Sequence, residues 1–176
     1  MRSGGVTPPA VAFVGYSGSG KTTFLAKVVT LLTDRGLSVG VIKHAPRHVS
    51  GSDRRATKDS DRFWEIGAAH VALVASDYVV HKWRSVVPPP VEEVVSSMSQ
   101  VDLVLVEGFK QSSLPKVEIV RAACHPALLP GLSARVALVT DVVGLECDVP
   151  RFSFDQPEAV VEFLMCRFLS QCKELT

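Results

Sequence analysis

Short apolar runs alternate along the chain with segments whose apolar residues recur at helical spacing. The runs cover residues 11–14, 39–42, 101–106, 117–120 and 136–140, and runs of this kind are typical of parallel strands buried on both faces. Residues 22–35 and 158–173 have the spacing of helices that pack one face against a sheet. The alternation predicts an α/β fold with βαβ units and a mostly parallel central sheet flanked by helices.

The middle of the chain has a different pattern. Residues 45–58 are polar and partly basic, which predicts a loop, and a short helix is expected over residues 59–66. Residues 71–75 and 78–83 are strand candidates, which we expect to supply extra antiparallel strands, and residues 91–98 predict another short helix. We expect a single domain over residues 1–176, with a flexible lead-in at residues 1–9.

Composition narrows the classes of function. The 176 residues carry a net charge of +1, with 19 basic and 18 acidic side chains, so there is no global charge to attract nucleic acid or a membrane surface. No apolar stretch reaches the ~20 residues of a membrane span, and the start of the chain does not resemble a signal peptide. The four cysteines are widely spaced, which favours structural thiols over a metal site and a cytoplasmic location.

One motif carries recognisable chemistry. Residues 15–22, GYSGSGKT, match the phosphate-binding loop (P-loop) pattern G-x-x-x-x-G-K-[ST] between an expected strand and an expected helix. Glycines let backbone N–H groups converge on phosphate oxygens, and the helix start directs its positive dipole end there. Lys21 is expected to reach the β- and γ-phosphates and Thr22 to bind Mg²⁺. The expected nucleotide-binding residues of the loop are Gly15, Ser17, Gly18, Ser19, Gly20, Lys21, Thr22 and Thr23.

Two later strand ends add acidic candidates. Glu107 follows the apolar run 101–106, at the end of the strand where open α/β sheets bind ligands. We expect Glu107 to act with Thr22 on the metal, and Gly108 to let the backbone approach the γ-phosphate. Asp141 follows the run 136–140 and is a candidate for reading a guanine base, although the usual N-K-x-D signature is missing and an ordinary turn aspartate is the alternative.

The order and spacing of several segments resemble the molybdopterin-guanine dinucleotide biosynthesis protein B family, MobB. The resemblance runs from about residue 11 to residue 141 and is carried by the P-loop, I-K-H at 42–44, K-D-S at 58–60 with Arg62, D-L-V-L-V-E-G-F-K at 102–110 and P-K-V-E at 115–118. It departs from the family pattern at residues 45–48 and 56–57, both within the expected 45–58 loop.

The resemblance implies a GTP-binding protein with weak Mg²⁺-dependent hydrolysis. It implies a homodimer that acts beside the guanylyltransferase of molybdenum cofactor synthesis, with molybdopterin itself a candidate ligand. Lys21, Glu107 and Asp59 are then the candidate catalytic residues, since Lys58, Asp59 and Arg62 match a segment near the γ-phosphate or a second ligand. Lys110 and Lys116 match basic positions by the same cleft.

Three other readings remain open at this stage. A small-molecule kinase is one, but such kinases usually carry an arginine-bearing lid helix where this chain has strand candidates. A GTP-dependent metallochaperone is another, although only His44 and His48 lie near the P-loop in sequence. A GTP-sensing adaptor with incidental hydrolysis is the third. Because no arginine finger or catalytic glutamine is evident, we expect slow turnover by the isolated chain.

Overall fold

The computed structural model describes residues 7–45 and 58–170, and the side chains of Lys58 and Asp59 lie outside what it describes. The chain forms two compact units, one of residues Met1–His44 with Pro90–Thr176 and one of residues Ala45–Pro89. The expectation of a single domain stays a prediction, and each unit is described here by itself. Among the described residues, no helix combines the length and the apolar character needed to cross a membrane.

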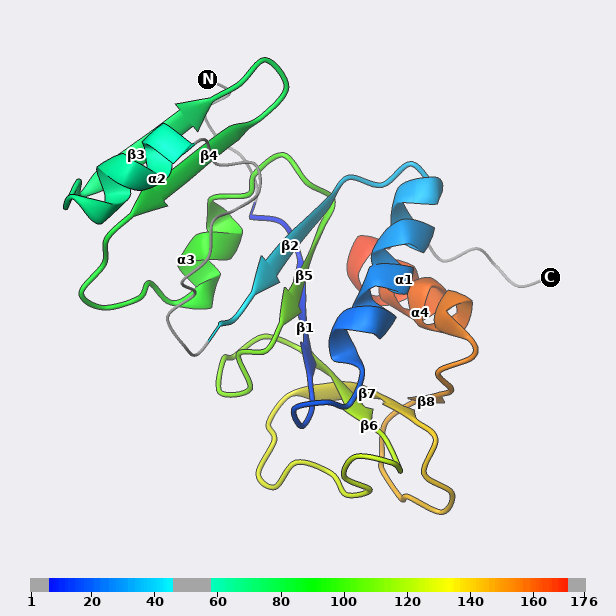
Figure 1. Cartoon of the computed structure of the whole chain (residues 1–176). Coiled ribbons are helices and arrows are strands. Elements are labelled where there is room, and N and C mark those ends of the chain that lie inside the picture. Colours follow the sequence, from blue (N-terminus) through cyan, green and yellow to red (C-terminus); the bar gives the residue numbers. More distant parts are fainter. Residues whose placement is uncertain (1–6, 46–57, 171–176) are drawn as a thin grey trace. The chain divides into compact units, whose positions relative to one another are not determined.

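A six-stranded sheet forms the centre of the first unit (Figure 1). Its strand order is β2-β5-β1-β6-β7-β8, and every pair of neighbouring strands is parallel. The carboxyl ends of all these strands therefore meet at one edge, where a doubly wound sheet binds its ligands. The strands are β1 (Ala10–Val14), β2 (Val39–Lys43), β5 (Leu103–Glu107), β6 (Lys116–Val120), β7 (Arg135–Thr140) and β8 (Arg151–Phe152).

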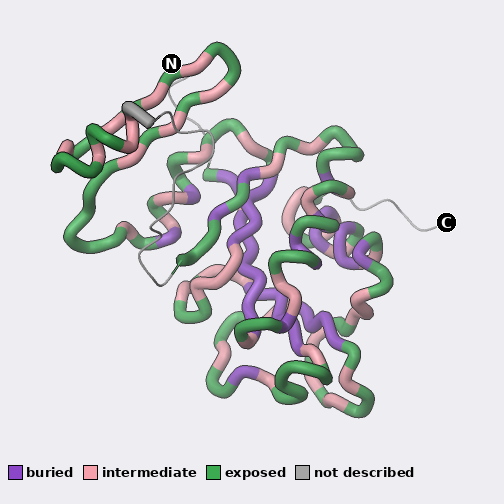
Figure 2. Tube along the Cα trace, in the orientation of Figure 1, coloured by how far each residue is buried: buried purple, intermediate pink, exposed green. Residues whose placement is uncertain are grey.

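Helices cover both faces of this sheet, because side chains alternate between faces along each buried strand. On β1, Val11 and Phe13 pack in one core cluster with helices α1 (Lys21–Asp34) and α4 (Pro157–Leu169). Ala12 and Val14 pack in a second cluster with the short helix α3 (Val91–Ser96). Figure 2 shows the result, a sheet whose central strands are buried along their length.

The second unit contains one helix and one antiparallel hairpin. Helix α2 spans Lys58–Glu65, and strands β3 (His70–Val74) and β4 (Val79–Trp83) pair antiparallel. Alternate residues of both strands are half-buried and exposed. An ion pair of 2.8 Å between Lys82 and Asp61 ties the hairpin to the helix.

The structure confirms the predicted class, a P-loop NTPase-like α/β fold with extra antiparallel strands. It also shifts some boundaries. The strand expected from residue 101 begins at Leu103 and includes Glu107. The carboxylate of Asp102, just before the strand, accepts a hydrogen bond from the backbone N–H of Ser38 at 2.8 Å. Of the expected lead-in, residues 1–6 lie outside the described part, whereas the carbonyl of Pro9 already accepts a hydrogen bond from Val104. The loop expected over 45–58 lies almost wholly outside the described residues.

Candidate functional site

The P-loop joins the carboxyl end of β1 to the first turn of α1. Gly20 is the N-cap of α1 with φ 82°, and none of the described side chains caps this helix. The N–H groups of the first turn and the positive end of the helix dipole are therefore available to an anion. No acidic residue lies in the first turn to compete for them.

At Gly15, directly after β1, the backbone passes too close to β6 to leave room for a side chain. A Cβ at this position would lie 2.3 Å from the carbonyl oxygen of Ile119 in β6, far inside van der Waals contact. Gly18, with φ 79°, adopts a left-handed conformation that side chains rarely allow. The predicted glycine positions thus have steric causes in the fold itself.

The hydroxyl of Ser19 supports a phosphate ligand for this loop. Ser19 is 1% exposed, and its Oγ is the one buried side-chain polar atom without a hydrogen-bond partner among the residues that the structure describes. An unpaired buried hydroxyl is costly and needs an explanation. A polyphosphate oxygen, which accepts hydrogen bonds, fits a donor set of backbone amides, a hydroxyl and a lysine.

Lys21 extends back across the loop that it terminates. Its Nζ donates to the carbonyl oxygen of Tyr16 at 2.6 Å, so the ammonium is held over the turn rather than released to solvent. Burial lowers the pKa of Lys21, the charge of Glu107 opposes this, and the charge of Lys110 adds to it. A negative ligand would offset that destabilisation of the charged form.

Thr22 and Glu107 come together although 85 residues separate them in sequence. The Thr22 hydroxyl donates to Oε1 of Glu107 at 2.8 Å, because β5 lies directly beside β1 in the sheet. A hydroxyl and a carboxylate are the oxygen ligands that Mg²⁺ takes from P-loop proteins, with phosphates and water completing the set. The two predicted metal residues fit that ion.

Lys43 contacts the same two residues, which the sequence did not reveal. It ends β2, and its Nζ lies 3.0 Å from Oε2 of Glu107 and 3.2 Å from Oγ1 of Thr22. Lys43 and Glu107 are register partners in the β2–β5 ladder. The sequence offered Lys43 as a strand-end residue of the I-K-H segment, with a binding role as one interpretation and a surface position as the other, and the strand order was needed to place its contacts.

Gly108 has a different local role from the one expected. Its N–H donates to the carbonyl oxygen of Phe13 at 3.0 Å, so this amide is already engaged in the sheet. A Cβ on Gly108 would lie 2.9 Å from the Cβ of His44, and the ring of His44 packs on Phe109 with centroids 4.6 Å apart. Approach of Gly108 to a γ-phosphate stays a prediction.

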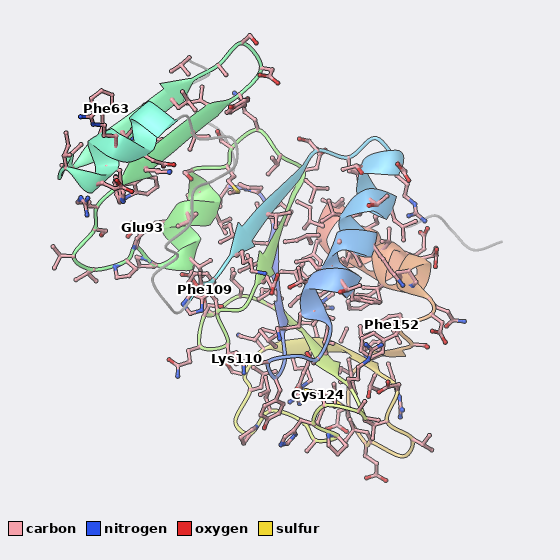
Figure 3. The ribbon with its side chains drawn as sticks, in the orientation of Figure 1. Phe63, Glu93, Phe109, Lys110, Cys124 and Phe152 are labelled. Carbon is pink, nitrogen blue, oxygen red and sulfur yellow. The ribbon has the colours of Figure 1, made fainter. Side chains whose placement is uncertain are left out.

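The segment after β6 borders the P-loop and was also missed. The thiol of Cys124 donates to the carbonyl oxygen of Ser17 at 3.1 Å, and the ring of His125 stacks on Tyr16 at 3.8 Å between centroids. Lys110 lies 5.3 Å from the centroid of the Tyr16 ring. Figure 3 shows Lys110 and Cys124 at the end of the sheet from which α1 starts.

Asp141 lies at the carboxyl end of β7 and is engaged by this same segment. Its Oδ1 accepts the N–H of Ala122 at 2.6 Å, and Oδ2 lies 3.6 Å from Nε of Arg121. The Arg121 guanidinium also lies 4.2 Å from the centroid of Phe154. Asp141 is 43% exposed in its side chain, so it remains accessible, and its reading of a base stays a prediction.

The remaining candidates lie on β6, on helix α2 of the second unit and in the first turn of α1. Lys116 begins β6, is fully buried, and donates to the carbonyls of Ser112 and Leu114 at 2.6 and 2.9 Å, so it secures the 108–115 loop. Lys58, Asp59 and Arg62 belong to α2 in the second unit. The side chain of Asp59 lies outside the described part, and its catalytic role stays a prediction. Thr23 is exposed in the first turn of α1.

Comparisons with known proteins agree with this geometry. The family model MobB, described as molybdopterin guanine dinucleotide synthesis protein B, matches residues 10–141. The molybdopterin-guanine dinucleotide biosynthesis adapter protein of Escherichia coli (strain K12) is 34% identical over 166 residues, covering 89% of this chain and 91% of that protein. The protein of the same description from Haemophilus influenzae is 33% identical, covering 89% and 87% of the two chains.

Solved structures of MobB proteins are also similar to this chain. The MobB protein homolog from Bacillus stearothermophilus aligns with a TM-score of 0.70 at 27% identity, covering 92% of this chain and 99% of that one. The Bacillus subtilis MobB structure aligns with a TM-score of 0.70 at 27% identity and covers 94% and 99%. On the strength of the family match, the relatives and the P-loop architecture together, this chain belongs to the MobB family.

Proposed function

We propose that this protein binds GTP with Mg²⁺ at its P-loop, hydrolyses it slowly, and serves in the cytoplasm as an adapter in the synthesis of the molybdopterin-guanine dinucleotide cofactor. The observation that carries the nucleotide half is the contact of 2.8 Å between Thr22 and Glu107, beside an uncapped helix start and the Lys21 ammonium. The pathway half is supported by the printed descriptions of relatives that are 33–34% identical.

Different groups of the P-loop are assigned to different parts of a bound triphosphate. The amides of the first turn of α1 and the unpaired hydroxyl of Ser19 are donors for phosphate oxygens. Lys21 contributes an ammonium that can exchange the carbonyl of Tyr16 for the β- and γ-phosphates. Such contacts bind the substrate and stabilise negative charge that develops during hydrolysis.

Thr22 and Glu107 are assigned to the metal. Mg²⁺, when bound there, would neutralise negative charge on the phosphates. Glu107 is 13% exposed in its side chain and lies at a fixed strand end, so it can hold a ligand position without rearrangement. The Arg121 guanidinium lies beside Gly20, 3.6 Å from Asp141 and over the ring of Phe154, and no catalytic role is assigned to it. We expect slow turnover unless a partner supplies the missing group.

The second unit offers a surface for association. On the hairpin, Val74, Val79 and Trp83 are 73%, 65% and 49% exposed, and on and beside α2, Phe63 and Ile66 are 56% and 74% exposed. Large apolar side chains left exposed on a small unit can mark a surface that a partner covers, and free strand edges are often covered or paired. These features support a homodimer and contact with the guanylyltransferase, with molybdopterin as a further candidate ligand.

A competition titration tests the choice of nucleotide. A fluorescent GTP analogue bound to the protein in magnesium buffer should be displaced by GTP at much lower concentration than by ATP, and Asp141→Asn should reduce this preference if Asp141 reads the base. Equal displacement by both nucleotides would remove GTP from the proposal and leave only a purine triphosphate site.

A capture experiment tests the adapter role. The protein loaded with GTP should retain purified guanylyltransferase of the cofactor pathway, and Lys21→Met should retain less if nucleotide controls the contact. Phosphate transfer to a small-molecule acceptor would instead favour a kinase, and nucleotide-dependent retention of a transition metal would favour a metallochaperone. Either result, with no capture of the transferase, would contradict the adapter role.

A further inference from the structure

We propose that the ammonium group of Lys43 competes with Mg²⁺ for the oxygen atoms of Thr22 and Glu107, and so sets the Mg²⁺ concentration that the nucleotide site requires. The inference rests on the proposed function, because that proposal assigns Thr22 and Glu107 to the metal. It adds a role for a residue that belongs to neither the P-loop nor the strand end that carries Glu107.

The geometry places a positive charge among the predicted metal ligands. Nζ of Lys43 lies 3.2 Å from Oγ1 of Thr22, and 3.2 and 3.0 Å from the two carboxylate oxygens of Glu107. Thr22 and Glu107 are themselves joined at 2.8 Å. The ammonium, the hydroxyl and the carboxylate therefore each contact the other two, and the ammonium occupies the position of a cation among the oxygens.

The register of the sheet holds Lys43 in this position. Strands β2 and β5 are parallel neighbours, and Lys43 pairs with Glu107 at the last position of the ladder. Paired residues of adjacent strands project to the same face, so the two side chains meet without distortion of either strand. The contact follows from the fold and does not depend on a loop conformation.

An ammonium and a magnesium ion compete for these oxygens. Both are hard cations that take carboxylate and hydroxyl oxygens, and two positive groups a few ångströms apart repel strongly. Glu107 is fixed at a strand end with 13% of its side chain exposed, whereas the Lys43 side chain is 57% exposed on a flexible stem. Lys43 is therefore the group that moves when the metal binds, and the metal must displace it.

Mn²⁺ binding to the full chain without nucleotide tests this directly. Mn²⁺ takes the same oxygen ligands as Mg²⁺, and its free fraction is read from the electron paramagnetic resonance signal. The variant Lys43→Met removes the charge and keeps the length of the side chain. We expect its half-saturating Mn²⁺ concentration to be about tenfold lower than that of the unmodified protein, a change of about 1.4 kcal/mol.

Two controls make the result specific. Lys27→Met removes an exposed lysine of α1, and it should leave the Mn²⁺ titration unchanged. Adding Glu107→Gln to Lys43→Met should abolish the gained affinity. Half-saturation of Lys43→Met at the same or a higher Mn²⁺ concentration than the unmodified protein, no detectable Mn²⁺ binding by Lys43→Met, or binding that survives Glu107→Gln, would each overturn the proposal.

A nucleotide titration separates this inference from the proposed function. With a fluorescent GTP analogue, the Mg²⁺ midpoint of binding should fall in Lys43→Met. Absence of nucleotide binding by every variant would contradict the proposed function, while the Mn²⁺ comparison would still decide the role of Lys43. Normal nucleotide binding with identical Mg²⁺ midpoints would contradict only the role of Lys43.

Discussion

The hydroxyl of Thr22 donates to the carboxylate of Glu107 at 2.8 Å, and this contact joins the first turn of α1 to the end of β5. The two residues are far apart in sequence, since the rest of α1, β2 and the second unit lie between them in the chain. They meet because β5 pairs with β1 in the sheet. The contact brings together the phosphate-binding and metal-binding parts of the proposed site.

Replacing Glu107 by Gln should separate the metal from the phosphate contribution. The amide is a weaker ligand for Mg²⁺, so nucleotide affinity in magnesium buffer should fall by about tenfold or more, whereas affinity in the presence of a chelator should change little. Isothermal calorimetry under both conditions measures this. Glu93→Gln, at an exposed position of α3, is the matched control, and an equal loss with and without Mg²⁺ would contradict the metal role.

Gly15→Ala should destabilise the fold by about 3 kcal/mol, because the new Cβ would lie 2.3 Å from the backbone oxygen of Ile119 and neither strand can shift freely. Gly36 also has positive φ, 82°, but nothing lies within 4 Å of its Cβ position. Gly36→Ala should therefore cost only about 1 kcal/mol, from backbone strain alone. Urea unfolding of both variants gives the comparison, and similar costs would argue against the close approach of Gly15 to Ile119.

The ion pair of Arg135 with Glu118 should matter far more for stability than the pair of Arg35 with Glu162. Glu118 is fully buried and accepts Nε of Arg135 at 2.6 Å and the N–H of Leu129 at 2.5 Å. Arg135→Met leaves a buried carboxylate without its cation and should cost about 3–5 kcal/mol.

Arg35→Met serves as the matched variant, since its pair is 30% and 50% exposed and should contribute about 0–1 kcal/mol. Chemical denaturation at neutral pH measures both. Equal costs for the two variants would show that Glu118 is not held in the interior as the structure has it.

Nucleotide binding should take up protons at alkaline pH. Burial lowers the pKa of Lys21 from its ordinary 10.5, and a bound polyphosphate favours the ammonium form and raises that pKa again. Affinity should therefore be highest below the lowered pKa and fall as pH rises through it. Calorimetry in buffers of different ionisation enthalpy detects the proton uptake, which should grow as the pH is raised from neutrality towards the lowered pKa. Uptake that does not change with pH would assign it to another group.

The sequence predicts the fold well because the central strands are buried on both faces. The apolar run at residues 11–14 predicts β1, and the P-loop pattern that follows fixes the start of α1. Strand β8 was not predicted, since its two residues, Arg151 and Phe152, are too few to give a pattern. They form a strand because β7 offers a free edge in the sheet.

The candidate site could be predicted only where one segment contains the chemistry. The P-loop residues are contiguous and can be read directly from the motif. Glu107 is predicted because open α/β sheets bind ligands at the carboxyl ends of their strands. The contacts of Lys43 and Cys124 depend on which strand lies beside β1, and no periodicity reveals that order. Lys116 illustrates the converse, because a family-matched basic residue proves to bind two backbone carbonyls inside the 108–115 loop.

The central claim is that the P-loop amides and Lys21 bind a nucleoside triphosphate, and calorimetric titration of GTP into the protein in magnesium buffer tests it most directly. The account predicts heat that saturates at one nucleotide per chain, and its loss in Lys21→Met, which should remain folded because it removes a charge that burial disfavours. No measurable heat from the unmodified protein, or equal binding by Lys21→Met, would contradict the account.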